Sequence, residues 1–385
     1  MTARTLAAAG VCAVLVPLVS ALPPALPGNS SWVVPEAGTA AAQAAAPELP
    51  VRSTRIERRD ARGGLSSAIS AIQRADAGPL WLGWTVPAVA SRDARGGRWS
   101  DGEVGRCVLE DDGAIRNSHG INDSTRRLVI LVRSQDAQIT RVAFTDERCA
   151  VDAGNRPVYF LSGVVPDQSV ALMAQLVRDR RPARAGGSKN DPHEQALPAL
   201  ALHGAPSAVV ALAECVRPGQ VRDLRRDAAF WLGAARGEAG AAVVERLARD
   251  DADDDFREHL TFVLTLVGDR GIDTLVTLAK RDSSAKVRGQ ALFWLGQKAG
   301  QRAVATLEGA VVDDPDREVR KKAVFALSQL PKDEGVPKLI AVARTHRDPE
   351  VRKQAMFWLG QSDDGRAVQF FEDVLKNEST LRNEP

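Results

Sequence analysis

The chain has 385 residues, which is enough for two or three domains at about 150 residues each. Apolar residues make up 44% of it and charged residues 26%, a balance typical of a globular protein. The 51 basic and 49 acidic residues nearly cancel, which argues against a nucleic-acid-binding protein that works through bulk charge. The chain has seven Trp residues but a single Tyr, which is an unusual ratio. The positions of the Trp residues are therefore considered below.

The N-terminus has the pattern of a secretory signal peptide. Arg4 precedes an apolar run that ends at Leu22, with small residues where cleavage is expected. A transmembrane anchor is the alternative, but the run is short for a span and is broken by Pro17. We therefore predict export, to the periplasm or outside the cell, with a signal at 1–22 or cleavage further on. Residues 23–50 are rich in Ala and Pro and are expected to form a disordered leader.

Residues 51–165 are expected to form a small β-rich domain. Short apolar runs separated by Gly, Pro and polar residues predict antiparallel strands, after one short helix at 65–75. Three residues from Ser134 to Asp136 separate two of these runs, which predicts a β-hairpin. The expected strands cover residues 79–89, 105–111, 126–134, 137–145 and 156–164.

Three Trp residues in this domain, Trp81, Trp84 and Trp99, pose a choice between a ligand platform and core packing. Trp81 and Trp84 are three residues apart, so a regular strand places them on opposite faces. We favour core packing, because large aromatic side chains contribute most when they are buried. His119 lies in a polar loop without a triad motif nearby, and we expect an ordinary loop residue there.

The cysteines fit an oxidising compartment. We predict a structural disulfide between Cys107 and Cys149, because an exported protein can oxidise two thiols of one domain. The alternative is a pair of buried thiols. Cys215 lies in an apolar helical stretch and is expected in the core. No C-x-x-C motif is present, so the sequence supports neither a zinc ribbon nor a thioredoxin-like site.

Residues 166–190 connect this region to the second half of the chain. Residues 166–178 return to a helical period, which predicts a helix that caps the elements after it. Residues 179–190 are basic and contain Gly and Pro, as linkers do.

A pattern with a period near 32 residues covers most of the second half. Five ten-residue segments start 32, 31, 32 and 32 residues apart, which indicates stacked helical repeats. They are LRRDAAFWLG from Leu224, FREHLTFVLT from Phe256, VRGQALFWLG from Val287, VRKKAVFALS from Val319 and VRKQAMFWLG from Val351. A second helical segment follows each, and a degenerate sixth unit precedes them. We therefore predict about six helix pairs over residues 191–380, stacked so that each buries the apolar stripe of its neighbour.

Three positions of the pattern do not vary. The second is always Arg, the seventh always Phe and the ninth always Leu, and Trp follows Phe in three segments. We expect these aromatic side chains to pack between repeats. The aromatic set is Phe230, Trp231, Phe262, Phe293, Trp294, Phe325, Phe357 and Trp358, and the Arg column is Arg225, Arg257, Arg288, Arg320 and Arg352.

The Arg column allows two interpretations. The five arginines, aligned along the repeats, could bind an acidic partner. Alternatively, each Arg pairs with carboxylates between repeats and covers apolar surface with its stem. We favour the second, because acidic residues lie within a turn of most of these arginines. The candidate carboxylates are Asp316, Glu318, Asp348 and Glu350.

The residues around each segment predict where its helix begins and ends. Asp316 and Asp348 stand three residues before their segments and are expected to be N-caps. Gly233, Gly296 and Gly360 stand at the tenth position and are expected to be C-terminal caps.

The pattern VRxxAxFWLG, with Asp-Pro ahead of it and Gly after it, resembles short HEAT repeats of the phycobilisome-lyase-like type, as in bacterial exported HEAT-repeat proteins. The resemblance covers roughly residues 191–375. It implies a mostly α fold, with a C-terminal right-handed α-solenoid after the small β-rich domain. It further implies that the second helices line a concave partner-binding face. It does not imply lyase activity, because fold analogy carries no chemistry.

The predicted function is a non-catalytic exported scaffold or adaptor that binds a protein partner through the solenoid. We expect no cofactor, metal or nucleic acid, and no membrane span after signal cleavage. The alternatives are a bilin-lyase-like enzyme and a HEAT-repeat metalloenzyme or oxidoreductase such as deoxyhypusine hydroxylase. That metalloenzyme needs several His-Glu pairs, whereas this chain offers His193-Glu194 and the reversed Glu258-His259. The acidic run at 250–255 lacks the spacing of a calcium loop, and no nucleophile–base pair is visible.

Overall fold

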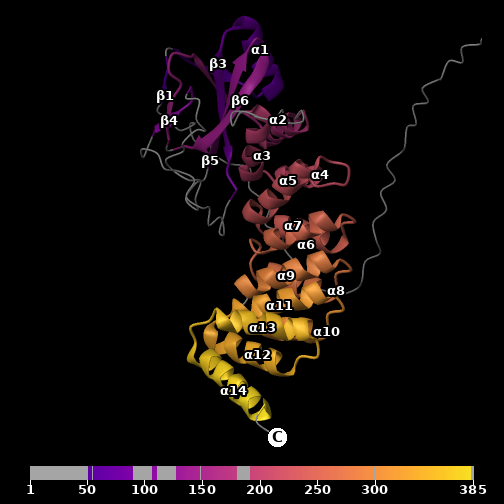
Figure 1. The fold of residues 1–385 in the computed structure, drawn as a ribbon. Helices are drawn as coiled ribbons and strands as arrows, with labels where there is room; N and C mark the ends of the chain where they lie inside the picture. Colours follow the sequence, from indigo (N-terminus) through magenta and orange to yellow (C-terminus); the bar gives the residue numbers. More distant parts are fainter. Residues whose placement is uncertain are drawn as a thin grey trace, which may run out of the picture. The chain divides into compact units, whose positions relative to one another are not determined.

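The computed structural model describes residues 51–53, 55–89, 106–110, 127–147, 149–179, 191–298 and 300–382. These residues belong to one compact unit, in which two small sheets precede a series of helices (Figure 1). The predicted fold class is confirmed: the protein is mostly α, with a C-terminal solenoid of helix pairs after a β-rich region. The predicted signal and leader at 1–50, together with Trp99 and His119, lie outside the described residues.

The larger sheet has five strands in the order β2-β8-β3-β5-β6. Strand β3 pairs antiparallel with β5, and β5 with β6, whereas β8 pairs parallel with both β2 and β3. The expectation of antiparallel pairing is therefore wrong for β2 and β8, because helices and loops separate these strands from their neighbours along the chain. The strands are β2 Ile56–Asp60, β3 Leu80–Pro87, β5 Arg127–Gln135, β6 Gln138–Asp146 and β8 Val158–Ser162.

The hairpin between β5 and β6 turns on Asp136 and Ala137, one residue later than the sequence predicts. Both have positive φ angles, 51° and 59°, which is the geometry of a two-residue type I′ turn. This turn fits the right-handed twist of the two strands, so the hairpin keeps its register along most of its length.

A second sheet has three parallel strands in the order β1-β7-β4, so antiparallel pairing is also wrong for the strand expected at 105–111. Its strands are very short: β1 Val51–Arg52, β4 Arg106–Val108 and β7 Ala150–Asp152. The apolar side chains between the sheets form a small core of their own, to which Trp81 and Val129 contribute. The sequence pattern did not predict β1 or β7, since two or three residues carry no alternation signal. It did not predict β2 either, because Ile56 is the only apolar residue of that strand.

Two helices complete the N-terminal region. Helix α1 spans Leu65–Ala75 and helix α2 spans Pro166–Arg178, both with the predicted bounds. The opposite face of the large sheet, with Trp84, packs on these helices, and its core is continuous with that of the helical repeats. Two backbone hydrogen bonds also join the parts: Val89 N–H donates to Leu202 O at 2.9 Å, and Gly204 N–H to Pro87 O at 2.7 Å.

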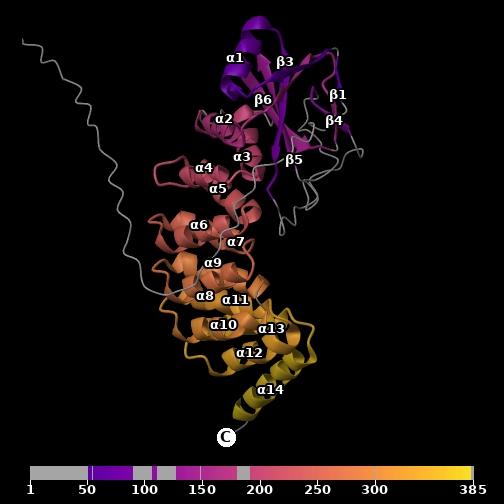
Figure 2. The same cartoon turned by 180° about the vertical axis from the view of Figure 1, so that it is seen from behind.

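The predicted repeat helices are confirmed. The first helices of successive units lie in one row and the second helices in another (Figures 1 and 2). The degenerate first unit is α3 Pro192–Leu202 with α4 Ser207–Cys215. The first helices of the other units are α5 Arg222–Ala235, α7 Asp254–Leu264, α9 Ala285–Lys298, α11 Arg317–Ser328 and α13 Pro349–Gly360. Their second helices are α6 Gly237–Asp250, α8 Asp269–Arg281, α10 Gln301–Asp313, α12 Lys332–Thr345 and α14 Gly365–Arg382.

The predicted Asp caps are present. Asp316 accepts hydrogen bonds from the N–H groups of Glu318 and Val319, and Asp348 accepts one from Glu350 N–H. Such caps satisfy N–H groups that the first helical turn leaves unpaired.

The glycines of the pattern do not cap helices, and that prediction is wrong. Gly233 and Gly296 lie inside α5 and α9, and Gly360 is the last residue of α13. Gly233 and Gly296 serve close packing, whereas a Cβ at Gly360 would meet only Phe371 Cζ, at 4.0 Å. A Cβ at Gly296 would stand 2.8 Å from the carbonyl oxygen of Ala326 in the next repeat. A Cβ at Gly233 would stand 2.5 Å from Cγ1 of Val263. The tenth position is small because two first helices approach each other there.

Candidate functional site

The first four arginines of the column each bridge two successive loops between repeats. Nη1 of Arg257 donates to Asp251 O in the loop before its helix at 2.7 Å, and Nε and Nη2 donate to the carboxylate of Asp282 in the next loop at 3.0 and 2.9 Å. Arg288 repeats this arrangement one unit on, between the carbonyl of Asp282 and the carboxylate of Asp314. Arg225 pairs with Asp251 in the same way. These arginines thus connect consecutive repeats through hydrogen bonds and ion pairs.

Burial makes these ion pairs structural. Arg225, Arg257 and Arg288 are 6%, 7% and 8% exposed, so no partner protein can reach their guanidinium groups. The hydrogen bonds that Arg257 and Arg288 donate to the carboxylates of Asp282 and Asp314 raise the pKa of both arginines above the ordinary Arg value. This geometry favours the second interpretation of the column.

The carboxylate column changes at its C-terminal end. Asp251, Asp282 and Asp314 are followed at the equivalent position by His346, whose ring accepts from Asp348 N–H and contacts Val311 O at 2.9 Å. Arg320 consequently pairs with the capping residue Asp348 at 3.0 Å, and the hydrogen bond from Arg320 lowers the pKa of Asp348 to about 2.

The arginine of the last unit, Arg352, donates to two backbone carbonyls, those of His346 at 2.7 Å and Arg347 at 3.3 Å. It therefore keeps the connection to the preceding loop, but it forms no ion pair within the described residues.

The aromatic side chains of the first helices form a ladder along their row. Phe230 stacks on Phe262 with ring centroids 6.4 Å apart, and Phe293 stacks on Phe325 at 5.9 Å. Between these pairs Trp294 meets Phe262 at 5.3 Å, and beyond them Trp358 meets Phe325 at 4.8 Å. Within one helix, Phe and Trp contact edge to face, as Phe230 and Trp231 do at 5.4 Å. Six rings of the predicted set therefore pack between repeats, whereas Trp231 and Phe357 contact only the neighbouring ring of their own helix among the described ring pairs.

The ladder is not a buried core. Its rings are partly exposed over the first helices, and Phe357 at the C-terminal end is 54% exposed. The ninth-position leucines beneath it, such as Leu295 and Leu327, are fully buried. Four of the five invariant Phe residues therefore stack on a neighbouring repeat, and all five present apolar surface to solvent.

The second helices present a different surface, on which charges are matched between repeats. Arg302 of α10 pairs with Asp269 and Asp273 of α8 at 2.6 and 2.7 Å. Lys338 of α12 pairs with Glu308 of α10 at 2.6 Å. Solvent screens such pairs, so they add little stability, but they leave fewer cations available on this face.

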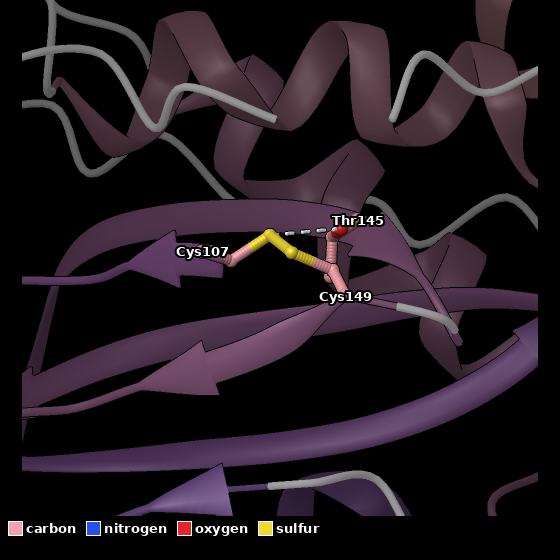
Figure 3. Close-up of a disulfide and its surroundings, with 3 residues drawn as sticks. All are labelled: Cys107, Thr145 and Cys149. Carbon is pink, nitrogen blue, oxygen red and sulfur yellow. Dashed lines mark hydrogen bonds between the residues drawn. A yellow bond between two sulfur atoms is a disulfide. The ribbon is translucent and has the colours of Figure 1, made fainter. Parts of the chain in front are cut away.

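The two predicted disulfide cysteines are joined (Figure 3). Cys107 on β4 and Cys149 just before β7 form a disulfide with a Cα–Cα distance of 5.9 Å, and Thr145 Oγ1 lies 3.3 Å from Cys107 Sγ. Both cysteines are fully buried. The free Cys215 is 4% exposed, and burial raises the pKa of its thiol to about 11, so it is not a reactive nucleophile.

The two Trp residues of β3 are core residues and no ligand platform. Both are fully buried on opposite faces of the strand, and each indole N–H has a partner. Trp81 donates to Glu110 Oε1 at 2.7 Å, and Trp84 donates to Ser169 Oγ at 2.9 Å. The second bond ties β3 to α2.

The histidine–glutamate pairs considered for iron do not meet. His193 lies at the start of α3, where its Nδ1 is 2.6 Å from Leu176 O. His259 belongs to α7 and is 3.3 Å from Arg226 O through Nε2. Within the described ranges, no group of three or more His, Cys, Asp or Glu side chains is placed to hold a metal ion. A membrane-spanning helix is also not found among the described helices, since none is long and apolar enough.

A family model of HEAT repeats matches residues 272–343, which run from within α8 into α12. The chain contains HEAT repeats. The same register of Arg, Phe and Leu continues on both sides of the matched residues, so the HEAT-like units extend from α5 to α14.

Solved structures with similar folds share little sequence with this HEAT-repeat chain. One chain of the CpcE–CpcF complex of phycocyanin lyase from Nostoc sp. is 22% identical, with a TM-score of 0.32, over 41% of this chain and 100% of that one. Human deoxyhypusine hydroxylase is 18% identical, with a TM-score of 0.28, over 54% and 90%. The karyopherin Kap121p bound to the SUMO protease Ulp1p is 11% identical, with a TM-score of 0.35, over 56% and 27%. No curated protein matches the sequence.

Two columns of residues were not predicted. The carboxylates that pair with the arginines are Asp251, Asp282 and Asp314, spaced 31 and 32 residues apart, whereas the sequence-based candidates centred on the helix caps. Exposed Gln side chains stand at the ends of three first helices, at Gln297, Gln329 and Gln361. Both columns repeat with the period of the Arg and Phe positions, so comparing the five units beyond their ten-residue segments would have found them.

Proposed function

We propose that this chain is an exported, non-catalytic scaffold that binds a protein partner through its HEAT repeats. The proposal rests on the aromatic ladder. It places partly exposed Phe rings at the same position in the first helices of five successive repeats. Exposed aromatic side chains are the residues most enriched at protein interfaces, and a series of them in register suits an extended contact.

Export is supported by the disulfide. A buried Cys107–Cys149 bond that joins two short elements of a sheet suits an oxidising compartment, since cytosolic thiols are kept reduced. It agrees with the signal pattern of the first 22 residues. N-terminal sequencing of the protein from cell fractions tests this part. A mature chain that begins between residues 23 and 47 in the periplasm or medium is expected, and a cytosolic chain that retains Met1 would overturn it.

Two of the similar structures were solved in complex with another protein: the CpcE–CpcF complex and Kap121p with Ulp1p. For the present chain the proposal rests on its own surface. For the metalloenzyme alternative, no group of three or more His, Cys, Asp or Glu side chains is placed to hold a metal ion among the described residues.

Proximity labelling with the mature chain, followed by binding of the purified candidate partner, tests the scaffold function. Saturable binding with a Kd of about 10 µM or below, measured by calorimetry, is expected of a specific interface. Absence of any protein that binds the purified chain would contradict the proposal. So would stoichiometric iron in the mature protein, or turnover that is lost on mutation of a defined residue set.

A further inference from the structure

The first-helix row changes character toward the C-terminus. Between the third and eleventh positions of their units, α9, α11 and α13 contain no Asp or Glu, whereas α5 and α7 carry Asp227 and Glu258 there. Three lysines stand in the same stretches, and of these Lys321 pairs with Glu318 in its own helix at 3.2 Å. Lys322 and Lys353 are exposed and form no ion pair within the described part of the chain. Over these positions the C-terminal part of the row is therefore cationic, and the exposed Glu318 and Glu350 stand one turn before the lysines.

Phe, Gln and Lys side chains share one surface on α11 and α13. Residues three or four apart on a helix lie on the same face, which places Lys322 and Gln329 on either side of Phe325. The same spacing places Lys353 and Gln361 on either side of Phe357. We call these six residues the α11–α13 face. It combines aromatic rings, neutral amides and unpaired cations in register across two repeats.

Local packing holds parts of this face in place. A Cβ at Gly289 would stand 2.6 Å from Cδ of Lys322, so the glycine of α9 leaves room for the lysine stem to lie across that helix. Gln297 Nε2 donates to Gln329 Oε1 at 3.0 Å, which aligns neighbouring amides along the row. Phe325 is fixed by its stacking on Phe293, while Phe357 stays 54% exposed.

We propose that the α11–α13 face binds an extended acidic peptide segment of a protein partner. The Phe rings contact its apolar side chains, the Gln amides hydrogen-bond to its backbone, and Lys322 and Lys353 pair with its carboxylates. An extended chain rises about 3.3 Å per residue, so about three residues span the 8–10 Å between packed helices. A helical partner has satisfied its own backbone groups and offers the amide column nothing, which is why the segment is extended.

The charge pattern selects the acidic partner. On the second helices, Arg302 and Lys338 pair with carboxylates of neighbouring repeats, whereas Lys322 and Lys353 form no ion pair among the described residues. Complementary charge raises the association rate and the specificity of a complex. Two free lysines suit a short acidic segment, while a nucleic acid requires many phosphate contacts for its affinity.

This inference rests on the proposed scaffold function and assigns partner binding to the α11–α13 face. Its test is selection of phage-displayed random twelve-residue peptides on the full mature chain. The selected peptides are synthesised with a fluorescent label, and their Kd is measured by fluorescence polarisation. Peptides enriched in Asp, Glu and apolar residues are expected, with affinity that falls as salt rises. An absence of enriched peptides, or enrichment of basic ones, would overturn the inference.

Charge reversal locates the site. Lys322→Glu combined with Lys353→Glu is expected to weaken the selected peptides at least about tenfold, and Phe357→Ser to do the same through lost apolar contact. The matched control reverses two exposed cations at the end of α8, Lys280→Glu with Arg281→Glu, and should leave the affinity unchanged. All three side-chain sites are on the surface, so circular dichroism should show an intact fold. Equal binding by the double variant and the wild type would place the site elsewhere.

Two further experiments distinguish nucleic-acid binding from protein binding, and this surface from other surfaces of the chain. A twelve-nucleotide single-stranded DNA that competes with the peptide would reassign the face to nucleic acid and contradict the proposal. The partner identified by proximity labelling is then tested against the Lys322→Glu/Lys353→Glu variant. Unchanged partner binding leaves the scaffold function standing and refutes this surface, whereas the lack of any partner refutes the scaffold function itself.

Discussion

Arg288 joins two consecutive repeats by donating from Nε and Nη2 to the two carboxylate oxygens of Asp314, at 2.8 and 3.0 Å. Its Nη1 also donates to the carbonyl of Asp282 at 2.9 Å, so one side chain connects the loops on both sides of its unit. Both charges are almost completely buried. Such a pair holds the register of the stack, and removal of one partner leaves a buried charge uncompensated.

Arg288→Ala is therefore expected to lower the free energy of unfolding by about 3–5 kcal/mol, because Asp314 would stay buried without its partner. The measurement is urea unfolding followed by Trp fluorescence. Arg302→Ala is the matched control, since Arg302 forms ion pairs that are exposed to solvent, and it should cost no more than about 1 kcal/mol. Similar losses in both variants would show that burial does not decide the strength of these pairs.

Gly296 and Gly309 offer a paired test of helix packing. Gly296→Ala is expected to destabilise the stack, because the new Cβ would stand 2.8 Å from Ala326 O and 3.0 Å from Ala326 Cα. Gly309→Ala, inside α10 with no neighbour within 4 Å, should instead stabilise the protein by about 0.5–1 kcal/mol through helix propensity. Thermal unfolding of the two variants should therefore shift in opposite directions. A shift of the same sign would contradict the packing role of the tenth position.

The disulfide should contribute strongly to the stability of the sheets. Its two cysteines are 42 residues apart, and closing a loop of that length restricts the unfolded chain by about 4 kcal/mol. Cys107→Ser with Cys149→Ser is expected to lose most of this amount in urea unfolding. Cys215→Ala is the control, because that thiol is unpaired. Mass spectrometry of the native protein should show two fewer hydrogens than after reduction, and an unchanged mass would rule out the bond.

His203 predicts a loss of stability in acid. The ring is fully buried, and burial together with the nearby Arg236 lowers its pKa from 6.5 to about 4. The folded state therefore keeps the neutral ring while the unfolded chain takes up a proton below pH 6.5. The stability contributed by this residue is complete above that pH and declines as the pH falls toward 4, by about 3 kcal/mol in total.

The variant His203→Gln removes the titrating group while it retains a polar side chain near Ala205 N–H. Urea midpoints of wild type and variant are compared at neutral pH and near pH 5. The wild type should lose more stability between the two conditions than the variant does. Equal losses would show that His203 does not control the acid sensitivity.

The sequence predicted the repeats because their signals are local and recur. Arg, Phe and Leu at fixed positions, Asp before the helix and an apolar stripe within it are properties of single segments, and the five copies exclude coincidence. Helix α2 was predicted with the correct bounds for the same reason, since its period and Pro166 at the first turn belong to one stretch of chain.

The parallel pairing of β8 was not predictable in this way. It joins β8 to β2, about one hundred residues earlier in the chain, and to β3 on its other side. Register across such separations depends on which faces the helices cover, and no local pattern encodes that. The glycines of the tenth position show the same limit. Gly after an apolar run is typical of a helix end, but here the approach of the next helix requires a residue without a side chain.

For the candidate site, the sequence by itself determined which residues recur: the Arg, Phe and Trp columns and the two cysteines that form the disulfide. Only the tertiary structure decided what each column does. Arg225, Arg257 and Arg288 are enclosed by carboxylates of the next loop, whereas Phe357 and Lys353 face solvent. The physical reason is that periodicity fixes where a side chain lies on its own helix, while burial and charge pairing depend on the helix that packs beside it.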